Sequence, residues 1–471
     1  MKNNSKIYDL LNFKIKVNKI HFIGVGGSGM SGIAEILFNL GFEISGSDIQ
    51  QSSITDHLKL MGMKISIGHH PDNINQQQAV VVSSAIDDSN SELIQALKLG
   101  IPIVPRAEML SELMRFRYGI AIAGTHGKTT TTSLISHIMS VAGLDPTYVI
   151  GGILKSSGSN ANLGESDYLI AEADESDGSF LMLNPMISVI TNIDKDHLEN
   201  YNNSFLRLKK AYAQFANNLP FYGTCIVCGE DKNLTSIQKN IHRKIISYGF
   251  DSKNNLYAKD IEFSNSSMTF KVVSDHHETP FDVSLNLVGK HNVLNALAAV
   301  SIAFELGIDS EIVQTALNSF GGVARRLDSH GVVNINNSKV EVFDDYGHHP
   351  NEIDAVLSAL KETRKNKRLF VIFQPHRFTR TQLLFNDFVK TLSKADQLIL
   401  IDIYPASESP IENVSSESLA NAIRQTSKLN PVVAKDIDEA YLLAENSIQD
   451  DDILLTLGAG NVNQLAKKLS Q

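Results

Sequence analysis

The sequence predicts an α/β protein built from three domains, and three observations lead to that prediction. The chain has 471 residues, of which 42% are hydrophobic, enough for about three domains of ~150 residues, each with its own core. Short apolar runs alternate with helix-like runs along much of the chain, as in parallel sheets covered by helices. Glycine-rich turns follow two of the apolar runs, as where a strand leads into a helix. We place the domains at residues 1–116, 117–324 and 325–471.

The overall composition excludes several classes of protein. The formal net charge of −10 argues against a nucleic-acid-binding protein, which would present a basic face. No apolar stretch reaches the ~20 residues that a helix needs to cross a bilayer, so we expect no membrane partner. The polar start, Met1–Lys6, lacks the apolar core of a signal peptide. These features predict a cytoplasmic protein.

The two cysteines, Cys225 and Cys228, have the C-x-x-C spacing found in zinc and redox sites. No second pair of Cys or His residues lies at ligand spacing, and the segment 223–229 has the composition of a short buried strand. Residues three apart on a strand point to opposite faces. We therefore expect two buried structural thiols.

The first domain begins with a predicted strand at 19–25, which runs into Gly24-Val25-Gly26-Gly27-Ser28-Gly29. A helix at 30–40 follows, and then a strand at 42–46 that leads to Asp48. This order of strand, G-x-G-x-x-G, helix, strand and acidic residue is typical of a Rossmann-like unit that binds a nucleotide or a nucleotide sugar. Strands at 79–83 and 101–104 and a helix at 91–99 complete the predicted domain.

The central domain contains the most informative segment, Ala123-Gly124-Thr125-His126-Gly127-Lys128-Thr129-Thr130, between a predicted strand at 118–123 and a helix at 131–142. This is the layout of a phosphate-binding loop. Glycines let the backbone N–H groups approach phosphate oxygens, Lys128 can reach the outer phosphates, and the Thr129 hydroxyl can ligate magnesium. Only two residues separate the glycines, where the common loop has four. A surface turn that happens to contain Gly-Lys-Thr is the alternative.

Two polar clusters follow the next apolar strands of the central domain. The strand at 168–171 ends in Glu172-Ala173-Asp174-Glu175-Ser176-Asp177, and the strand at 187–191 ends in Asn192-Ile193-Asp194-Lys195-Asp196-His197. Ligands of open α/β sheets bind at the carboxyl ends of strands. Glu172 is a suitable magnesium ligand. His197 is either a contact for a second metal or for phosphate, or an ordinary polar residue. Residues 221–285 are richer in β-strand, and a helix is expected at 292–306.

The third domain follows Arg325-Arg326 and alternates again. Strands are expected at 340–343, 369–373, 397–403 and 453–457, with helices at 350–360 and 380–392, which predicts a second Rossmann-like sheet. The strand ends Asp344–Pro350 and Gln374–Arg380 are rich in arginine and histidine, which suits a small carboxylate ligand. His348 and His349 with the aspartates are alternatively metal ligands. The arginine pair is either an arginine finger or a surface bridge.

Six motifs occur in a fixed order: the first glycine loop, the phosphate loop, Glu172–Asp177, Thr191–His197, His291–Ala296 and Arg325-Arg326. This order resembles the Mur ligase superfamily, from about Lys19 to Val462. The short phosphate loop is that superfamily's own form of the motif. The two strand ends of the third domain resemble the branch of the superfamily that uses L-alanine.

The resemblance implies an ATP-dependent ligase of peptidoglycan precursor synthesis. ATP phosphorylates the lactyl carboxylate of UDP-N-acetylmuramate, and the amine of L-alanine attacks the acyl phosphate. The near alternative is the recycling ligase that attaches a whole tripeptide to the same nucleotide sugar. A nicotinamide dehydrogenase and a nucleotide-dependent binding switch are alternatives from other classes.

The resemblance also implies site residues, matched motif by motif. ATP is held by Gly124, Thr125, His126, Gly127, Lys128, Thr129, Thr130, Asn292, Asn295 and Arg326, and Mg²⁺ by Thr129, Glu172 and His197. The UDP-sugar is held by Gly26, Gly27, Ser28, Asp48, Ser83 and Ser84, and L-alanine by Tyr346, His348, Arg377 and Arg380. Lys128, His197, Arg326 and His348 are the expected catalytic residues. Lys209 and Lys210 are the nearest candidates for a carbamylated lysine beside the second metal, a role the sequence leaves open.

Overall fold

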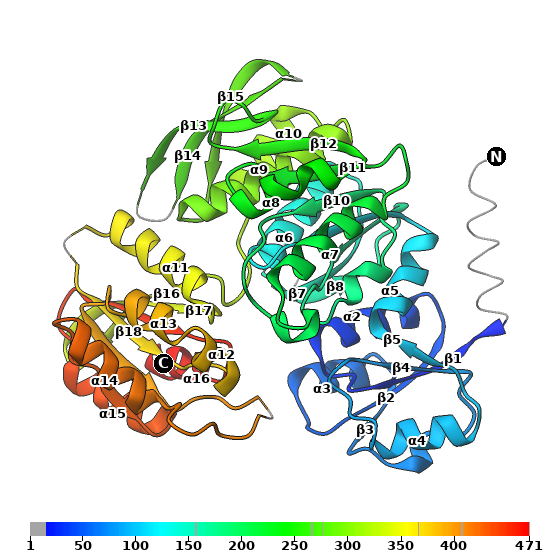
Figure 1. The fold of residues 1–471 in the computed structure, drawn as a ribbon, viewed down its shortest axis with the longest axis horizontal. Coiled ribbons are helices and arrows are strands. Elements are labelled where there is room, and N and C mark those ends of the chain that lie inside the picture. The colour runs from blue at the N-terminus through cyan, green and yellow to red at the C-terminus, as the bar shows by residue number, and fades with distance from the viewer. Residues whose placement is uncertain are drawn as a thin grey trace. The chain divides into compact units, whose positions relative to one another are not determined.

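The computed structural model describes residues 16–470 except 156, 157, 265, 266, 276, 366 and 407, and it leaves out the side chains of Ser28, His277 and Glu278. The polar start Met1–Lys6 therefore lies outside the described residues, as does the Ser28 side chain. The described chain falls into two compact units (Figure 1). One contains residues up to 260 with 270–284 and 294–321, and the other contains 261–269, 285–293 and 322 onward.

The first sheet is a five-stranded parallel sheet of order β3-β2-β1-β4-β5. Its strands are β1 (Lys19–Ile23), β2 (Glu43–Asp48), β3 (Lys64–Ile67), β4 (Ala79–Val82) and β5 (Ile103–Pro105). Its helices are α2 (Ser28–Asn39), α3 (Ser53–Leu60), α4 (Ser91–Lys98) and α5 (Arg106–Arg115), and η1 (Pro71–Asn73) is a short 3₁₀ turn. The strand order reverses between β1 and β4, where open parallel sheets bind ligands. The predicted Rossmann-like domain is confirmed, and α3 and β3 are additions to the predicted pattern.

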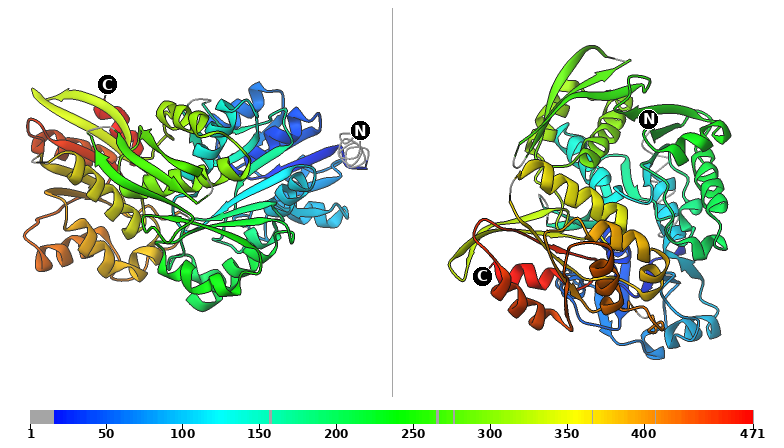
Figure 2. Two further views of the ribbon diagram at one scale, coloured as in Figure 1. Left: turned by 90° about the horizontal axis from the view of Figure 1, so that it is seen from above. Right: turned by 60° about the vertical axis from the view of Figure 1, so that its left-hand side comes forward.

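The second sheet has ten strands in the order β15-β14-β13-β12-β11-β10-β6-β9-β7-β8. Its strands are β6 (Tyr118–Ala123), β7 (Thr147–Leu154), β8 (Ser159–Asn162), β9 (Tyr168–Glu172), β10 (Ile187–Ile190), β11 (Thr224–Cys228), β12 (Lys244–Gly249), β13 (Leu256–Phe263), β14 (Met268–Ser274) and β15 (His277–Leu285). The strands β13 to β15 lie side by side, drawn in green in Figures 1 and 2. They are the predicted extra strands of the central domain.

The central strands are buried because helices cover them. These are α6 (Lys128–Val141), α7 (Phe205–Asn217), α8 (Lys232–Ile237), α9 (Lys290–Glu305) and α10 (Ser310–Ser319), with short turns η2 (Ser179–Met182), η3 (Leu198–Tyr201) and η4 (Gln238–Asn240). Cys225 and Cys228 are free thiols buried in β11, as expected. Burial raises the pKa of Cys225 to about 12 and that of Cys228 to about 11, so both are unreactive thiols.

The first two sheets are joined within one unit by helix α2, which packs on the β7–β8 hairpin. A Cβ atom at Gly32 would lie 3.0 Å from the Cβ of Ala161, so the helix backbone approaches the hairpin closely. Asn160 also donates a 3.3 Å hydrogen bond to Ser31. The helix that follows the first glycine loop is thus attached to the sheet that carries the phosphate loop.

The third sheet has six strands in the order β16-β17-β21-β18-β19-β20. Its strands are β16 (Asp328–Ile335), β17 (Ser338–Asp345), β18 (Leu369–Phe373), β19 (Gln397–Ile401), β20 (Val432–Ala434) and β21 (Ile453–Leu457). Only the β16–β17 pair is antiparallel among the pairings of this sheet in the described residues. Separate apolar clusters include side chains from β17, β18 and β21. The second predicted Rossmann-like sheet is confirmed.

Helices of the third sheet are α11 (Pro350–Thr363), α12 (Phe378–Leu383), α13 (Phe385–Leu392), α14 (Ser416–Thr426), α15 (Ile437–Ser447) and α16 (Asn463–Leu469). The single helix predicted at 380–392 is wrong, because the backbone leaves the helical region at Leu384, with φ −108° and ψ 20°. Leu384 packs into the apolar core with Phe388. Within the described chain, no helix is long and apolar enough to cross a membrane.

Candidate active site

The phosphate loop requires glycine at two positions. Gly124 has φ +134°, and a Cβ atom there would lie 2.0 Å from the Thr191 hydroxyl oxygen. Gly127 has φ +83°, and a Cβ atom there would lie 2.5 Å from Asn295 Oδ1. Both conformations disfavour side chains, and both positions are closed by neighbouring atoms. The loop therefore has the tight backbone that an anion site requires.

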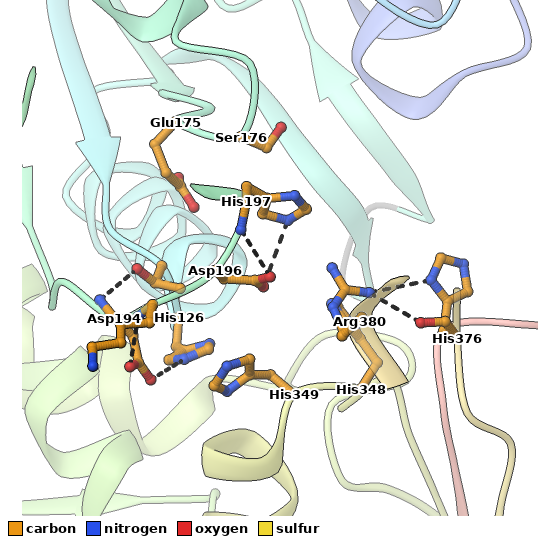
Figure 3. Close-up of polar contacts among 12 residues, drawn as sticks. His126, Glu175, Ser176, Asp194, Asp196, His197, His348, His349, His376 and Arg380 are labelled. Atoms are coloured by element: carbon orange, nitrogen blue, oxygen red, sulfur yellow. Dashed lines mark hydrogen bonds and ion pairs between the residues drawn. The ribbon is translucent and has the colours of Figure 1, made fainter. Parts of the chain in front are cut away.

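The end of the neighbouring strand β10 holds the loop in place. The His126 N–H donates to Asn192 Oδ1 at 2.9 Å, and the Thr191 hydroxyl donates to the His126 carbonyl at 2.6 Å. The Asp194 N–H donates to the Thr125 hydroxyl at 2.9 Å. The His126 Nε2 and Asp194 Oδ2 atoms lie 3.2 Å apart (Figure 3). Thr191 and Asn192 were not among the predicted site residues, although their motif follows a predicted strand.

Helix α6 begins at Lys128, so its first N–H groups and the positive end of its dipole face the loop. Thr129 and Thr130 are buried in this first turn. The Thr131 hydroxyl donates to Asn295 Oδ1 at 3.2 Å, which ties helix α9 to the phosphate loop. Asn292 is buried three residues earlier on α9, and its amide donates to the Val288 carbonyl.

Lys128 is paired with a carboxylate that the sequence analysis did not select. Its Nζ donates to Glu175 Oε2 at 2.7 Å and Oε1 at 3.0 Å, and to the Gly124 carbonyl at 2.6 Å. Burial lowers the pKa of Lys128, but Glu175 and Asp174 outweigh this and raise it, so the lysine stays charged. Burial, with a contribution from Asp174, raises the pKa of Glu175 to about 7 even though Lys128 opposes the shift.

Glu172, the predicted magnesium ligand, lies at the end of β9. Its Oε1 accepts the N–H of Gly151 on β7 at 2.6 Å. Its negative charge contributes to the raised pKa of Lys128. The carboxylate is thus oriented by the backbone and lies near enough to influence the phosphate lysine.

His197 follows β10 in a left-handed conformation, with φ +52°. Its N–H donates to Asp196 Oδ1 at 3.0 Å, and its Nε2 lies 3.5 Å from Asp196 Oδ2 (Figure 3). Its Nδ1 lies 3.7 Å from Glu199. Carboxylates therefore lie beside both ring nitrogens, so a metal ion can bind the imidazole only by replacing one of them.

The first glycine loop closes on the end of β2. The Gly26 N–H donates to Asp48 Oδ2 at 2.8 Å, and the N–H groups of Gly24 and Val25 donate to the Ser47 carbonyl at 2.8 and 3.0 Å. Gly27 precedes the first turn of α2. Ser83 and Ser84 follow β4, on the other side of the point where the strand order reverses.

A buried polar network supports this loop, and no sequence motif predicted it. Glu92 on α4 is fully buried and accepts hydrogen bonds from the Ser47 hydroxyl and the Asn73 amide. His21 Nε2 lies 3.5 Å and His69 Nδ1 lies 3.4 Å from Glu92 Oε2. Burial raises the pKa of Glu92, but the contacts with His21, Asn73 and Ser47 outweigh it and lower the pKa to about 2. The network anchors the residue whose carbonyl binds the glycine loop.

Arg325 and Arg326 contact different groups. Arg325 Nε donates to Asp344 at 3.1 Å and its Nη2 donates to the Gly458 carbonyl at 2.6 Å, so it joins the ends of β17 and β21. The Arg326 guanidinium lies 5.4 Å from the Tyr346 ring centre. Its charge lowers the pKa of Asp345, although burial dominates and raises that pKa to about 6. Burial, together with Arg326, lowers the pKa of His291 to about 4.

The residues predicted to bind L-alanine lie at or just after the carboxyl ends of β17 and β18. The rings of Tyr346 and His348 meet edge to face with 5.5 Å between centres, and His348 lies 5.9 Å from His376. Arg380 is buried and contacts His376 Nδ1 at 3.3 Å (Figure 3). The Nε atom of Arg377 is buried and has no hydrogen-bond partner among the described residues. An arginine donor of this kind suits a small carboxylate.

Comparison with known proteins explains this combination of sites. Three family models match: the Mur ligase family catalytic domain at residues 19–118, the Mur ligase middle domain at 122–303 and the Mur ligase glutamate ligase domain at 326–460. The chain is 59% identical over 457 residues to the UDP-N-acetylmuramate--L-alanine ligase of Vesicomyosocius okutanii, covering 97% of each chain. The chain belongs to the Mur ligase family. The predicted superfamily is confirmed.

Two further comparisons agree with this assignment. The Mur ligase of Dichelobacter nodosus, also called UDP-N-acetylmuramate--L-alanine ligase, is 49% identical and is covered to 96%. The solved structure of UDP-N-acetylmuramate-alanine ligase from Thermotoga maritima matches with a TM-score of 0.81 at 28% identity, over 96% of this chain and 98% of that one. A murein peptide ligase from Psychrobacter arcticus has the same fold, with a TM-score of 0.72 at 23% identity.

Lys209 and Lys210 are the candidates for a carbamylated lysine in this Mur ligase, and the Lys209 side chain contacts other residues. Lys209 Nζ donates to the Ser236 hydroxyl at 3.3 Å and lies 4.9 Å from the Phe205 ring centre. Lys210 is exposed. The structure therefore supplies no contact that assigns either lysine to a metal site.

Proposed function

We propose that this chain is an ATP-dependent ligase that joins L-alanine to the carboxylate of UDP-N-acetylmuramate. The observation that carries the proposal is the 48–59% identity, over nearly the whole chain, to relatives named for this activity. The phosphate loop and the arginine-rich strand ends supply the chemistry that the activity requires. The proposed compartment is the cytoplasm.

The first step is activation of a poor acyl donor. A carboxylate does not react with an amine, so the γ-phosphate of ATP is transferred to it and becomes the leaving group. Lys128 and the first turn of α6 hold the phosphates and stabilise the charge that moves during transfer. Arg326 is the proposed contact for the γ-phosphate. The glycine loop, with Gly26, Gly27, Asp48, Ser83 and Ser84 as its proposed contacts, holds the UDP part of the acceptor.

Mg²⁺ is proposed at the oxygen donors Thr129 and Glu172, which suit a hard cation. The fit rests on the Glu172 carboxylate, which the Gly151 N–H orients at the end of β9. His197 is the proposed contact for a second metal ion. When bound, magnesium neutralises phosphate charge during transfer.

The second step needs an amine that has lost its proton. His348 Nδ1 lies 3.2 Å from the Tyr346 carbonyl and 3.7 Å from Glu352. Both neighbours accept hydrogen bonds, so Nδ1 carries the proton and Nε2 has the lone pair. His348 is therefore the proposed base for the L-alanine ammonium group, while Arg377 and Arg380 bind its carboxylate.

A ligation assay with two acceptors tests the proposal. Purified protein is given UDP-N-acetylmuramate, ATP and Mg²⁺ with either free L-alanine or the tripeptide, and products are identified by mass. We expect ADP, phosphate and the L-alanine adduct in equal amounts. Product with the tripeptide alone would assign the chain to the recycling reaction instead.

A further inference from the structure

The Lys128 ammonium group has no donor left for a phosphate. An ammonium has three N–H donors. Its Nζ contacts both Glu175 oxygens at 2.7 and 3.0 Å, the Gly124 carbonyl at 2.6 Å and the Thr125 carbonyl at 3.4 Å. A phosphate oxygen can bind Nζ only by replacing one of these acceptors.

Only the Glu175 carboxylate can leave without unfolding the loop. The carbonyls of Gly124 and Thr125 belong to the backbone, which β10 holds through Thr191 and Asn192. Glu175 reaches Lys128 through a side chain with rotatable bonds. The Tyr201 hydroxyl donates to the Glu175 backbone carbonyl, so the backbone stays in place while the side chain rotates.

We infer that Glu175 is an internal counterion that occupies Lys128 in the empty enzyme and that the triphosphate of ATP displaces. This inference rests on the proposed function, because it assigns a state to the same ATP site. Glu175 is then a positioning residue. It keeps the buried lysine charged and extended before ATP arrives, and its displacement opposes ATP binding.

A second position for the displaced carboxylate is present beside the first. Tyr212 on α7 is fully buried, and its hydroxyl has no hydrogen-bond partner in the described part of the chain. Burial, with the neighbouring Glu175 charge, raises the pKa of Tyr212, and this outweighs a contact with the Thr125 side chain that lowers it, so the hydroxyl keeps the proton it would donate. A rotated Glu175 gains a donor there, and the proton of the buried Tyr212 hydroxyl gains an acceptor.

The charges around Glu175 make the exchange sensitive to local electrostatics. The ionisable groups that face it are Lys128 on α6, Asp174 in its own loop, Tyr201 in η3 and Tyr212 on α7. Lys128 is the one cation among these groups. Once a triphosphate takes Lys128, the Glu175 charge is opposed by Asp174 and by the phosphates, which favours rotation toward Tyr212.

Affinity for a non-hydrolysable ATP analogue with Mg²⁺, measured by calorimetry, tests the inference. Glu175→Gln removes the competing charge and keeps the shape of the side chain. At pH 8, we expect it to bind the analogue about tenfold more tightly than the wild type. Tyr212→Phe removes the second position, and we expect about threefold weaker binding. Unchanged or weaker binding by Glu175→Gln would overturn the inference.

Asp174→Asn is the matched control for general electrostatics. It removes one negative charge from the same loop; Asp174 pairs with Arg106 at 3.6 Å and acts on Lys128 through its charge. We expect it to change the affinity less than twofold. A gain equal to that of Glu175→Gln would show that charge alone, and not occupation of Lys128, sets the affinity.

The affinity of the Tyr212→Phe variant and ligation by the wild type distinguish failure of this inference from failure of the proposed function. If Glu175→Gln does not fold, the Tyr212→Phe variant decides, since unchanged affinity there contradicts a second position for the carboxylate. Wild-type ligation of L-alanine is measured in parallel. If the wild type forms the L-alanine product but the variants bind the ATP analogue as the wild type does, this inference is wrong and the proposed function stands. If the variants bind the analogue with altered affinity but the wild type forms no product, the proposed function is wrong and this inference stands.

Discussion

The glycine loop at 24–29 and the phosphate loop at 124–130 both join a buried parallel strand to the start of a helix. In the first loop, the Gly26 N–H is bonded to the Asp48 carboxylate, and α2 contains no lysine or arginine. In the second, Lys128 is the first helical residue and is paired with buried Glu175. The first loop presents backbone groups beside a carboxylate, while the second presents a charged lysine.

This difference matches the proposed roles of the two loops, in which the first holds a nucleotide and the second takes part in a reaction of one. Backbone N–H groups and a carboxylate suit a nucleotide whose phosphates stay intact and whose hydroxyls need an acceptor. A buried lysine suits a phosphate whose charge changes during transfer. Four substitutions test whether the two loops differ in this way.

Lys128→Ala removes the charge of the phosphate loop. We expect ligation to fall about 1000-fold or more, because the transferred phosphate loses its main cation. Binding of UDP-N-acetylmuramate, measured by calorimetry, should stay within about twofold of wild type. Substantial remaining turnover would contradict the role given to this lysine.

Glu92→Gln tests the buried support of the first loop. The folded pKa of Glu92 is lowered from 4.5 to about 2, so its ionised form stabilises the fold above about pH 4.5. This contribution, about 3 kcal/mol, is lost as the pH falls from 4.5 toward 2. Urea unfolding should show the variant less stable at pH 7, with the gap closing toward pH 2. A gap independent of pH would exclude this account.

Asp48→Asn removes the charge that binds the Gly26 N–H. We expect the KM for UDP-N-acetylmuramate to rise about tenfold, while the KM for ATP stays unchanged, because the phosphate loop does not use Asp48. Initial rates with each substrate varied in turn measure both constants. Equal increases in the two constants would show that the loops are not separable in function.

The smallest effect is a pH dependence of ATP binding. Burial raises the pKa of Glu175 to about 7, so its charge competes for Lys128 above pH 7 and is neutralised below it. The affinity advantage of Glu175→Gln over wild type should shrink from about tenfold at pH 8 to about 1.1-fold at pH 6. Because protonation of the nucleotide affects the wild type and Glu175→Gln equally, its effect cancels when the two affinities are compared at the same pH. An advantage that is constant with pH would argue against a titrating counterion.

Much of the fold could be predicted from the sequence because strands and helices here follow local patterns. The strands at 369–373 and 453–457 have the bounds that were expected, since each is a continuous apolar run. The helix expected at 380–392 is divided at Leu384, where packing into the core overrides the periodic pattern. The domain boundaries at 116 and 324 stay predictions.

The site was predicted less completely, because motifs mark regions and not contacts. The run Glu172–Asp177 was expected at the correct strand end, yet nothing in its order shows that Glu175 faces Lys128 while Glu172 meets Gly151. The Glu92 network joins residues from β1, β2 and the loop after β3, so no local pattern could announce it.

Local sequence patterns were enough to locate the two glycine-containing loops and the residues that could carry charge there. Glycines at positive φ and a lysine at the start of a helix depend only on residues that are adjacent in the sequence, so a short motif is enough to predict them. The carboxylate that pairs with Lys128, and the strand end that holds each loop, could be identified only from the three-dimensional arrangement. Those choices depend on strand order, which places residues far apart in the chain within hydrogen-bond distance.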